Sequence, residues 1–193
     1  MSTIGAEDAA FAAESLGELG HPMLDAPVSG SVPGVEAGTL ALRVGGEARV
    51  VEEYRPVLEA IGDKIFHLGP SGFETRLKLV MNLVAAANLD VPAEGLALGE
   101  AAGIPAERGV EVLMTGAAAS KMCEIKGPKI AARSYDPQFK LLHMVKELYH
   151  ALGRESRTPL SLAGLVSQVY TAGLGEHGEK DISAVSEAGR RPA

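Results

Sequence analysis

The stretch Asp25-Ala26-Pro27-Val28-Ser29-Gly30-Ser31 sets the character of this 193-residue chain. The segment from Pro22 to Val28 is short and apolar, and it predicts a β-strand. From Ser29 to Gly38 the chain holds three glycines and a proline, which predicts a loop. Small residues at the end of a strand expose backbone N–H groups and hydroxyls, and these suit a carboxylate or a phosphate. An ordinary Ser/Gly turn is the alternative interpretation.

The sequence around this stretch has the pattern of an α/β segment. A helix is expected from Glu7 to Leu19, ended by Gly20. Two further apolar runs predict strands at Thr39–Val44 and Lys64–Leu68, with a helix between them at Glu47–Ile61.

After Gly72 the pattern becomes helical. Apolar residues recur at helical spacing from Phe73 to Ala102, and Gly103 is expected to end that helix. Pro92 removes one backbone hydrogen bond, so the helix is expected to kink or to split in two near Asp90. Shorter helices are expected at Pro105–Met114, Ala117–Glu124, Pro137–Leu152, Pro159–Ala172 and Asp181–Glu187, and this half has no strand signal.

The amino-acid composition argues against several classes of protein. Apolar residues make up 46% of the chain and aromatic residues only 4%, so the core must be built from small aliphatic side chains. The net charge is −7 and the Lys and Arg residues are scattered, which argues against nucleic acid as a partner. No apolar run is long enough to span a membrane. The single cysteine, Cys123, is expected to be an apolar side chain in a reducing compartment, and we expect a cytoplasmic protein.

One apparent motif is rejected. Gly173-Leu174-Gly175-Glu176-His177-Gly178 matches the dinucleotide-binding pattern G-x-G-x-x-G. That pattern binds a pyrophosphate only when it follows a strand and opens a helix. Here it follows a predicted helix, so termination of that helix by glycine explains it better.

Lys78 and Asn82 lie four residues apart, hence on one face of the long predicted helix. Their sequence neighbours are apolar, and an amine in such a setting can exchange protons near neutral pH. The alternative is a solvated stripe in which Glu74 and Lys78 form an i,i+4 ion pair worth only about 0.3–0.5 kcal/mol.

Taken together, these motifs resemble the β-hydroxyacid dehydrogenases, the family of 3-hydroxyisobutyrate dehydrogenase, tartronate semialdehyde reductase and, more distantly, 6-phosphogluconate dehydrogenase. The matching segments are residues 25–31, Gly38-Thr39-Leu40, Gly72 with Lys78 and Asn82, Phe139 with Lys146, Asp181 with Ser183 and Ala184, and Met1-Ser2-Thr3. Two positions depart from the family pattern: Asp is usual where Glu147 stands, and glycine is usual at the position of Glu74. Its carboxylate would clash with an acid substrate or hold Lys78 protonated.

The resemblance implies a role for each matched residue. Lys78 would be the general acid and base. Asn82 would orient the substrate oxygen, and Ser29, Gly30 and Ser31 would hold the substrate carboxylate. Residues on the cofactor side would be Ser2, Thr3, Phe139 and Lys146, whereas Asp181 and Ser183 would serve packing and capping. No residue is assigned to a metal.

The expected fold class is α/β followed by all-α. Residues 1–69 would be the C-terminal part of a Rossmann-like domain that binds NAD or NADP, with its glycine-rich half absent. Residues 70–188 would form the long linking helix and a helical domain for substrate and dimerisation, and 189–193 a tail. The implied activity is hydride transfer between NAD(P) and a small anionic 3-hydroxy acid or its semialdehyde, in a homo-oligomer (a dimer or tetramer). The alternative is a non-catalytic remnant or interaction module of that family.

Overall fold

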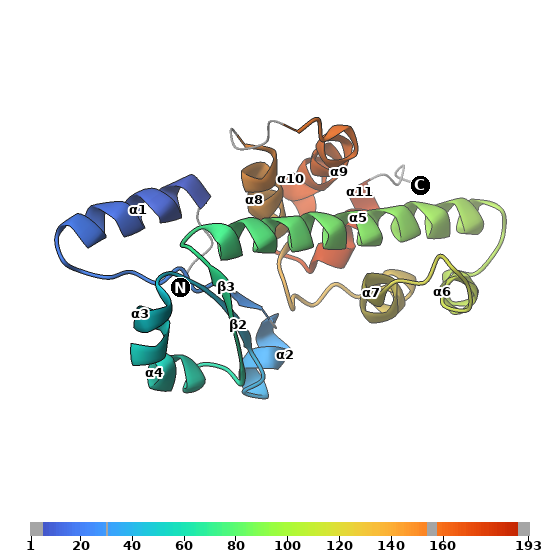
Figure 1. The fold of residues 1–193 in the computed structure, drawn as a ribbon. Coiled ribbons are helices and arrows are strands. Elements are labelled where there is room, and N and C mark those ends of the chain that lie inside the picture. Colours follow the sequence, from blue (N-terminus) through green and yellow to red (C-terminus); the bar gives the residue numbers. More distant parts are fainter. Residues whose placement is uncertain (1–5, 30, 154–157, 189–193) are drawn as a thin grey trace. The chain divides into compact units, whose positions relative to one another are not determined.

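The computed structural model describes residues 6–29, 31–153 and 158–188 (Figure 1). The chain divides into two compact units, Met1–Met81 and Asn82–Ala193. The first contains the strands, and the second is helical throughout its described residues. The structure therefore has the expected fold class, a Rossmann-like remnant followed by a helical domain.

A three-stranded sheet organises the first unit. Its central strand β2 (Ala41–Gly45) pairs antiparallel with the short β1 (Val28–Ser29) and parallel with β3 (Lys64–Gly69). Leu42 and Val44 of β2 are fully buried, because alternate residues of a strand point to the same face. The expected strands of β2 and β3 are confirmed, whereas only the end of the segment from Pro22 to Val28 forms a strand, with Asp25 adding an isolated bridge to Gly45.

The helices of the first unit differ from expectation in two places. After α1 (Ala6–Glu18), the predicted loop from Ser29 to Gly38 contains a helix, α2 (Ser31–Glu36). Pro33 is tolerated because it lies in the first turn, where a backbone N–H has no helical acceptor. Gly38 then ends the helix in the left-handed region, at φ 66°.

The predicted helix from Glu47 to Ile61 is two helices, α3 (Ala48–Glu53) and α4 (Arg55–Glu59), separated at Tyr54. Pro56, near the start of α4, has no N–H with which to continue the hydrogen bonds of α3. The prediction of one continuous helix was therefore wrong at that proline.

The long helix α5 (Phe73–Ala101) continues through Pro92, so the predicted split near Asp90 is wrong. Pro92 leaves the carbonyl of Asn88 without its helical partner. Ser120 Oγ compensates, lying 3.3 Å from Asn88 O. The same hydroxyl accepts a hydrogen bond from Cys123 N at 3.0 Å and caps α7 (Lys121–Ala131). This cap makes the helix begin at Lys121, later than the predicted Ala117.

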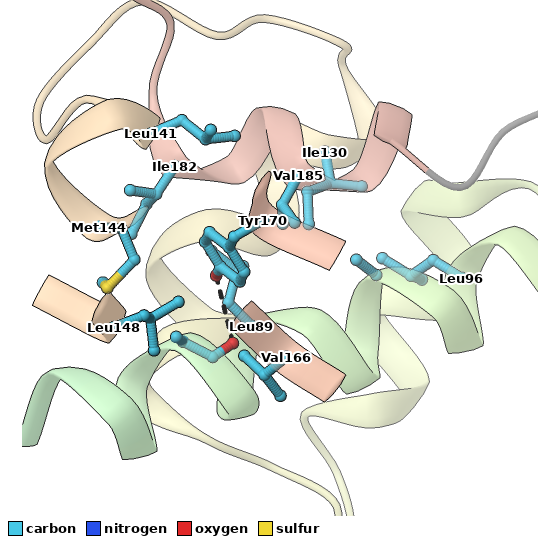
Figure 2. Packing of buried hydrophobic residues seen from close by; sticks show 12 residues of the cluster. Leu89, Leu96, Ile130, Leu141, Met144, Leu148, Val166, Tyr170, Ile182 and Val185 are labelled. Atoms are coloured by element: carbon cyan, nitrogen blue, oxygen red, sulfur yellow. Dashed lines mark hydrogen bonds between the residues drawn. The ribbon is translucent and has the colours of Figure 1, made fainter. Parts of the chain in front are cut away.

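The second unit is built around one apolar cluster (Figure 2). It draws on α5, α7, α8 (Leu141–Leu152), α9 (Ser161–Ala172), the 3₁₀ helix η1 (Ile182–Ala184) and α11 (Val185–Ala188). Tyr170 is fully buried at its centre, and its hydroxyl donates a hydrogen bond to Ala86 O at 3.2 Å. The shorter α6 (Ala106–Leu113) packs against α7. Cys123 is buried, as expected.

The glycine run at 173–178 ends a helix, as the sequence indicated. Gly173 is the C-cap of α9, and residues 174–177 form the one-turn helix α10 (Leu174–His177). A helix, not a strand, precedes the run, so it lacks the setting of a dinucleotide-binding loop.

Asp181 is a buried hydrogen-bonding centre of the second unit. It accepts hydrogen bonds from Lys126 Nζ at 2.8 Å, Gln138 N at 2.9 Å and Ser183 Oγ at 2.8 Å, and it also caps η1 through Ser183 N. Burial raises its pKa, but these donors outweigh burial and hold the pKa below the ordinary value. The expected packing and capping role of Asp181 is therefore visible in the structure.

The buried carboxyl group of Asp90 should make the stability of the second unit depend on pH. Burial in α5, with a smaller contribution from the charge of Glu94, raises its pKa from 3.8 to about 6. Because the folded value exceeds the unfolded one, the contribution of Asp90 to stability is fully present below about pH 4 and is lost as the pH rises through about 6. Asp90→Asn should remove this fall and raise the free energy of unfolding at pH 7.5 by about 1–2 kcal/mol.

Urea unfolding of both proteins at pH 4.5 and 7.5 measures the effect. Equal losses of stability in wild type and Asp90→Asn between these two pH values would contradict it.

Among the described helices, none has the length and apolarity needed to cross a membrane.

Candidate functional site

Asp25 joins the two sequence segments that carry the predicted site. Its carboxylate is buried and accepts hydrogen bonds from Gly72 N at 3.2 Å and Thr75 Oγ1 at 2.7 Å. Its backbone pairs with Gly45, with N–O distances of 2.9 and 2.7 Å. Asp25 begins the segment at 25–31, and Gly72 and Thr75 begin the helix that carries Lys78. The structure therefore brings the two segments together at their starts.

Lys78 and Asn82 lie in α5, four residues apart and both half-buried. Helical spacing places them on the same face. The expected apolar surroundings are only partly present: Leu79 is buried, whereas Leu77 and Val80 are exposed. Lys78 as a whole is thus neither fully buried nor fully exposed.

Ser29 ends β1 and Ser31 begins α2. Gly30 lies outside the described residues, and so do the side chains of Ser29 and Ser31. Their backbone places the proposed carboxylate-binding turn between a strand and a helix, where the sequence predicted a strand followed by a loop.

The structure buries Glu74, whereas the alternative interpretation of the sequence placed it on a solvated helix face. Its side chain is fully buried, and neither carboxylate oxygen has a hydrogen-bond partner. A Cβ added to Gly45 would lie 1.8 Å from Glu74 Oε2, so the carboxyl group rests against the end of β2. The solvated stripe with Lys78 is therefore wrong for this residue, because its side chain is buried. The expected clash with an acid substrate stays a prediction.

Of the residues assigned to the cofactor side, the structure describes Phe139 and Lys146, which lie before and within α8. Phe139 precedes α8, is half-buried and packs against the apolar cluster of the second unit, with its ring 5.9 Å from that of His143. Lys146 is an exposed residue of α8. An exposed cation and an aromatic face are chemistry that fits a dinucleotide. Ser2 and Thr3 lie outside the described residues.

Sequence reasoning missed two side chains that shape the site and the fold. Thr75 was not singled out, although its hydroxyl shares the carboxylate of Asp25 with Gly72 N. Lys126 was not singled out either, although its amine is buried against Asp181. Both partners are distant in the chain, so the sequence offers no periodic or local signal for either contact.

Two family models cover almost the whole chain. Residues 1–69 match the model described as the NAD binding domain of 6-phosphogluconate dehydrogenase. Residues 72–188 match the model described as the NAD-binding domain of NADP-dependent 3-hydroxyisobutyrate dehydrogenase. The boundary between them falls just before α5.

Individual relatives agree with the family models. The chain is 31% identical to glyoxylate/succinic semialdehyde reductase 1 of Arabidopsis thaliana, over 97% of this chain and 66% of that protein. It is 34% identical to 2-(hydroxymethyl)glutarate dehydrogenase of Eubacterium barkeri, over 96% of this chain and 63% of that protein. The chain thus spans just under two thirds of the length of these relatives.

The fold also matches that of a solved structure. The 3-hydroxyisobutyrate dehydrogenase of Mycobacterium tuberculosis, in a structure with L-serine, is 30% identical, with a TM-score of 0.90 over 98% of this chain and 68% of that one. Sequence motifs, fold and comparisons agree, and the chain belongs to the β-hydroxyacid dehydrogenase family.

Proposed function

We propose that this protein is an NAD(P)-dependent oxidoreductase of the 3-hydroxyisobutyrate dehydrogenase type, which moves hydride between NAD(P) and a small 3-hydroxy acid or its semialdehyde. The observation that carries the proposal is the junction at Asp25, because it joins the segment that leads into the turn at 29–31 to the first turn of the helix that bears Lys78. Relatives named for semialdehydes and for a hydroxymethyl acid support the substrate class.

Each residue has a chemical task in this proposal. Lys78 Nζ accepts the hydroxyl proton when the alcohol is oxidised and returns it when the carbonyl is reduced. Asn82 donates a hydrogen bond to the same oxygen. Ser29, Gly30 and Ser31 bind the carboxylate through backbone N–H groups and hydroxyls. The bound cofactor supplies or accepts the hydride, with Ser2, Thr3, Phe139 and Lys146 proposed on its side.

The charge of the chain makes these contacts necessary. A net charge of −7 repels an acid substrate at long range. Local positive groups, the amine of Lys78 and the N–H groups of the turn, must therefore offset the repulsion. We accordingly expect binding of an anionic substrate to weaken as salt screens these contacts.

We assign residues 1–69 to a nucleotide-binding domain and residues 70–188 to a helical substrate and dimerisation domain. The bounds of the two family models support this division. The single cysteine supports a reducing compartment such as the cytoplasm.

A homo-oligomer, dimer or tetramer, is part of the proposal. Three apolar residues of α5 in the second unit, Val84, Val91 and Leu98, stand at seven-residue intervals and are 51%, 63% and 75% exposed. Such a stripe is the pattern of a helix that packs on another helix. We expect Val91→Glu to shift the protein to lower mass in light scattering. The control is Glu107→Lys, a charge change on an exposed residue of α6, and an unchanged mass in Val91→Glu would contradict this interface.

The central experiment titrates the purified chain with NADH and NADPH and follows nicotinamide fluorescence. Saturable binding at micromolar concentrations, with turnover of a small 3-hydroxy acid or semialdehyde, supports the enzyme. Absence of binding at millimolar concentrations would favour the alternative, a non-catalytic interaction module of the same family.

A further inference from the structure

The carboxyl group of Glu74 is enclosed at the point where three segments of the first unit meet. These segments are the chain before β1, the end of β2 and the start of α5. Glu74 is 0% exposed. A Cβ built on Gly45 would meet its Oε2 at 1.8 Å and its Cδ at 2.5 Å, so the missing side chain of Gly45 provides the space that the carboxyl group fills.

The polar groups around Glu74 are already engaged with each other. Asp25 accepts hydrogen bonds from Gly72 N and Thr75 Oγ1. The backbone N–H of Gly45 donates to Asp25 O at 2.7 Å, and His67 Nε2 lies 2.9 Å from Gly46 O. Among the described residues, neither oxygen of the Glu74 carboxyl group has a hydrogen-bond partner.

A buried carboxylate without a donor is costly, so the neutral acid is favoured. Burial raises the pKa of Glu74, and the charge of Asp25 before β1 raises it further. Its own backbone N–H and His67 of β3 act in the opposite direction, the former without a hydrogen bond of normal geometry. The neutral acid can remain against Gly45, whereas the ionised form gains by moving towards water.

We propose that Glu74 is a positioning residue for Lys78: its neutral carboxyl group, enclosed against Gly45, fixes the first turn of α5 to the end of β2, and loss of that proton releases the turn. The functional part of this proposal rests on the proposed role of Lys78 as acid and base. Glu74 and Lys78 are one helical turn apart, so a shift or fraying of the first turn displaces the amine directly. A displacement of about 1 Å in a reacting group costs up to about a hundredfold in rate.

The experiment uses the full chain and three variants. Glu74→Gln keeps the shape and cannot ionise. Gly45→Ala places a methyl group where the carboxyl lies and so displaces Glu74 while keeping its titratable group. Glu59→Gln, an exposed residue of α4 in the same unit, is the matched control. The probes are the ¹³C resonance of the Glu74 side-chain carboxyl and the backbone amide resonance of Lys78, recorded between pH 4 and 9, together with the pH profile of kcat.

The proposal expects the Glu74 carboxyl to titrate above the ordinary value of about 4.3 for glutamate. It also expects the Lys78 amide to shift with the same midpoint, in wild type and Glu59→Gln but not in Glu74→Gln. Gly45→Ala should show the shifted Lys78 resonance at every pH. Over the same midpoint, kcat of the wild type should fall about ten- to a hundredfold, and that fall should be absent in Glu74→Gln.

Two results would overturn the proposal: an ordinary midpoint for Glu74, or a Lys78 amide that titrates identically in wild type and Glu74→Gln. Failure of the proposed function is recognised separately. If the wild type binds neither nicotinamide cofactor and turns over no hydroxy acid, the enzyme assignment fails, while the resonances of Glu74 and Lys78 still decide whether the one positions the other.

Discussion

Lys78→Met is expected to lower kcat by about 10²–10⁴-fold, because the substrate oxygen loses the group that exchanges its proton. Methionine keeps the length and the apolar contacts of the half-buried side chain, so the fold should persist. Binding of NADH or NADPH should change little, since no cofactor contact is assigned to this amine. The measurements are steady-state kinetics and nicotinamide fluorescence on the same preparations.

The matched control is Lys64→Met, which removes an exposed amine from β3 of the same unit and should leave kcat unchanged. Retention of more than a tenth of the wild-type kcat by Lys78→Met would remove this residue from the proton-transfer step. An equal loss in Lys64→Met would show instead that the net charge of the chain governs the rate.

Lys126→Met is expected to lower the free energy of unfolding by about 3 kcal/mol at pH 7, because it leaves the carboxylate of Asp181 buried without its cation. The loss lies at the low end of the range for broken buried pairs, since backbone N–H groups of Gln138 and Ser183 still donate to Asp181. Urea unfolding followed by far-UV circular dichroism measures it.

The same pair predicts a pH dependence with a definite sign. The pKa of Asp181 is lowered in the folded protein, so its stabilising contribution is present above the unfolded value of about 3.9 and is lost as the pH falls through the folded value. The deficit of Lys126→Met should therefore shrink towards pH 3. The control is Lys121→Met. The side chain of Lys121 is 72% exposed in the same helix and pairs with Glu124, so its loss should cost less than about 0.5 kcal/mol. A similar loss in both variants would contradict a special role for the buried pair.

The sequence predicted the elements whose signals are local. Apolar runs located β2 and β3, helical spacing located α5, and glycines located the ends of α1 and α5 at positive φ. The errors occurred where a proline or a cap has a partner elsewhere. Pro92 is accommodated by the hydroxyl of Ser120, which is remote in the chain and cannot be inferred from helical periodicity.

The candidate site shows the same limit. The spacing of Lys78 and Asn82 was enough to place them on one face of α5, because a helix repeats regularly. The position of Glu74 could not be predicted, since it depends on a Cα atom of β2 coming within contact of the helix start. The burial of a polar residue such as Glu74 is decided by its tertiary neighbours, not by its own sequence context.

The hydrogen bonds of Asp25 also bear on how this protein can be dissected. The bounds of the two family models, residues 1–69 and 72–188, suggest two modules that could be expressed separately. A fragment ending at residue 69 would keep Asp25 but lose Gly72 and Thr75, the donors to its buried carboxylate. The first turn of α5 is thus part of the earlier module, and a fragment that keeps both donors has to extend past Thr75.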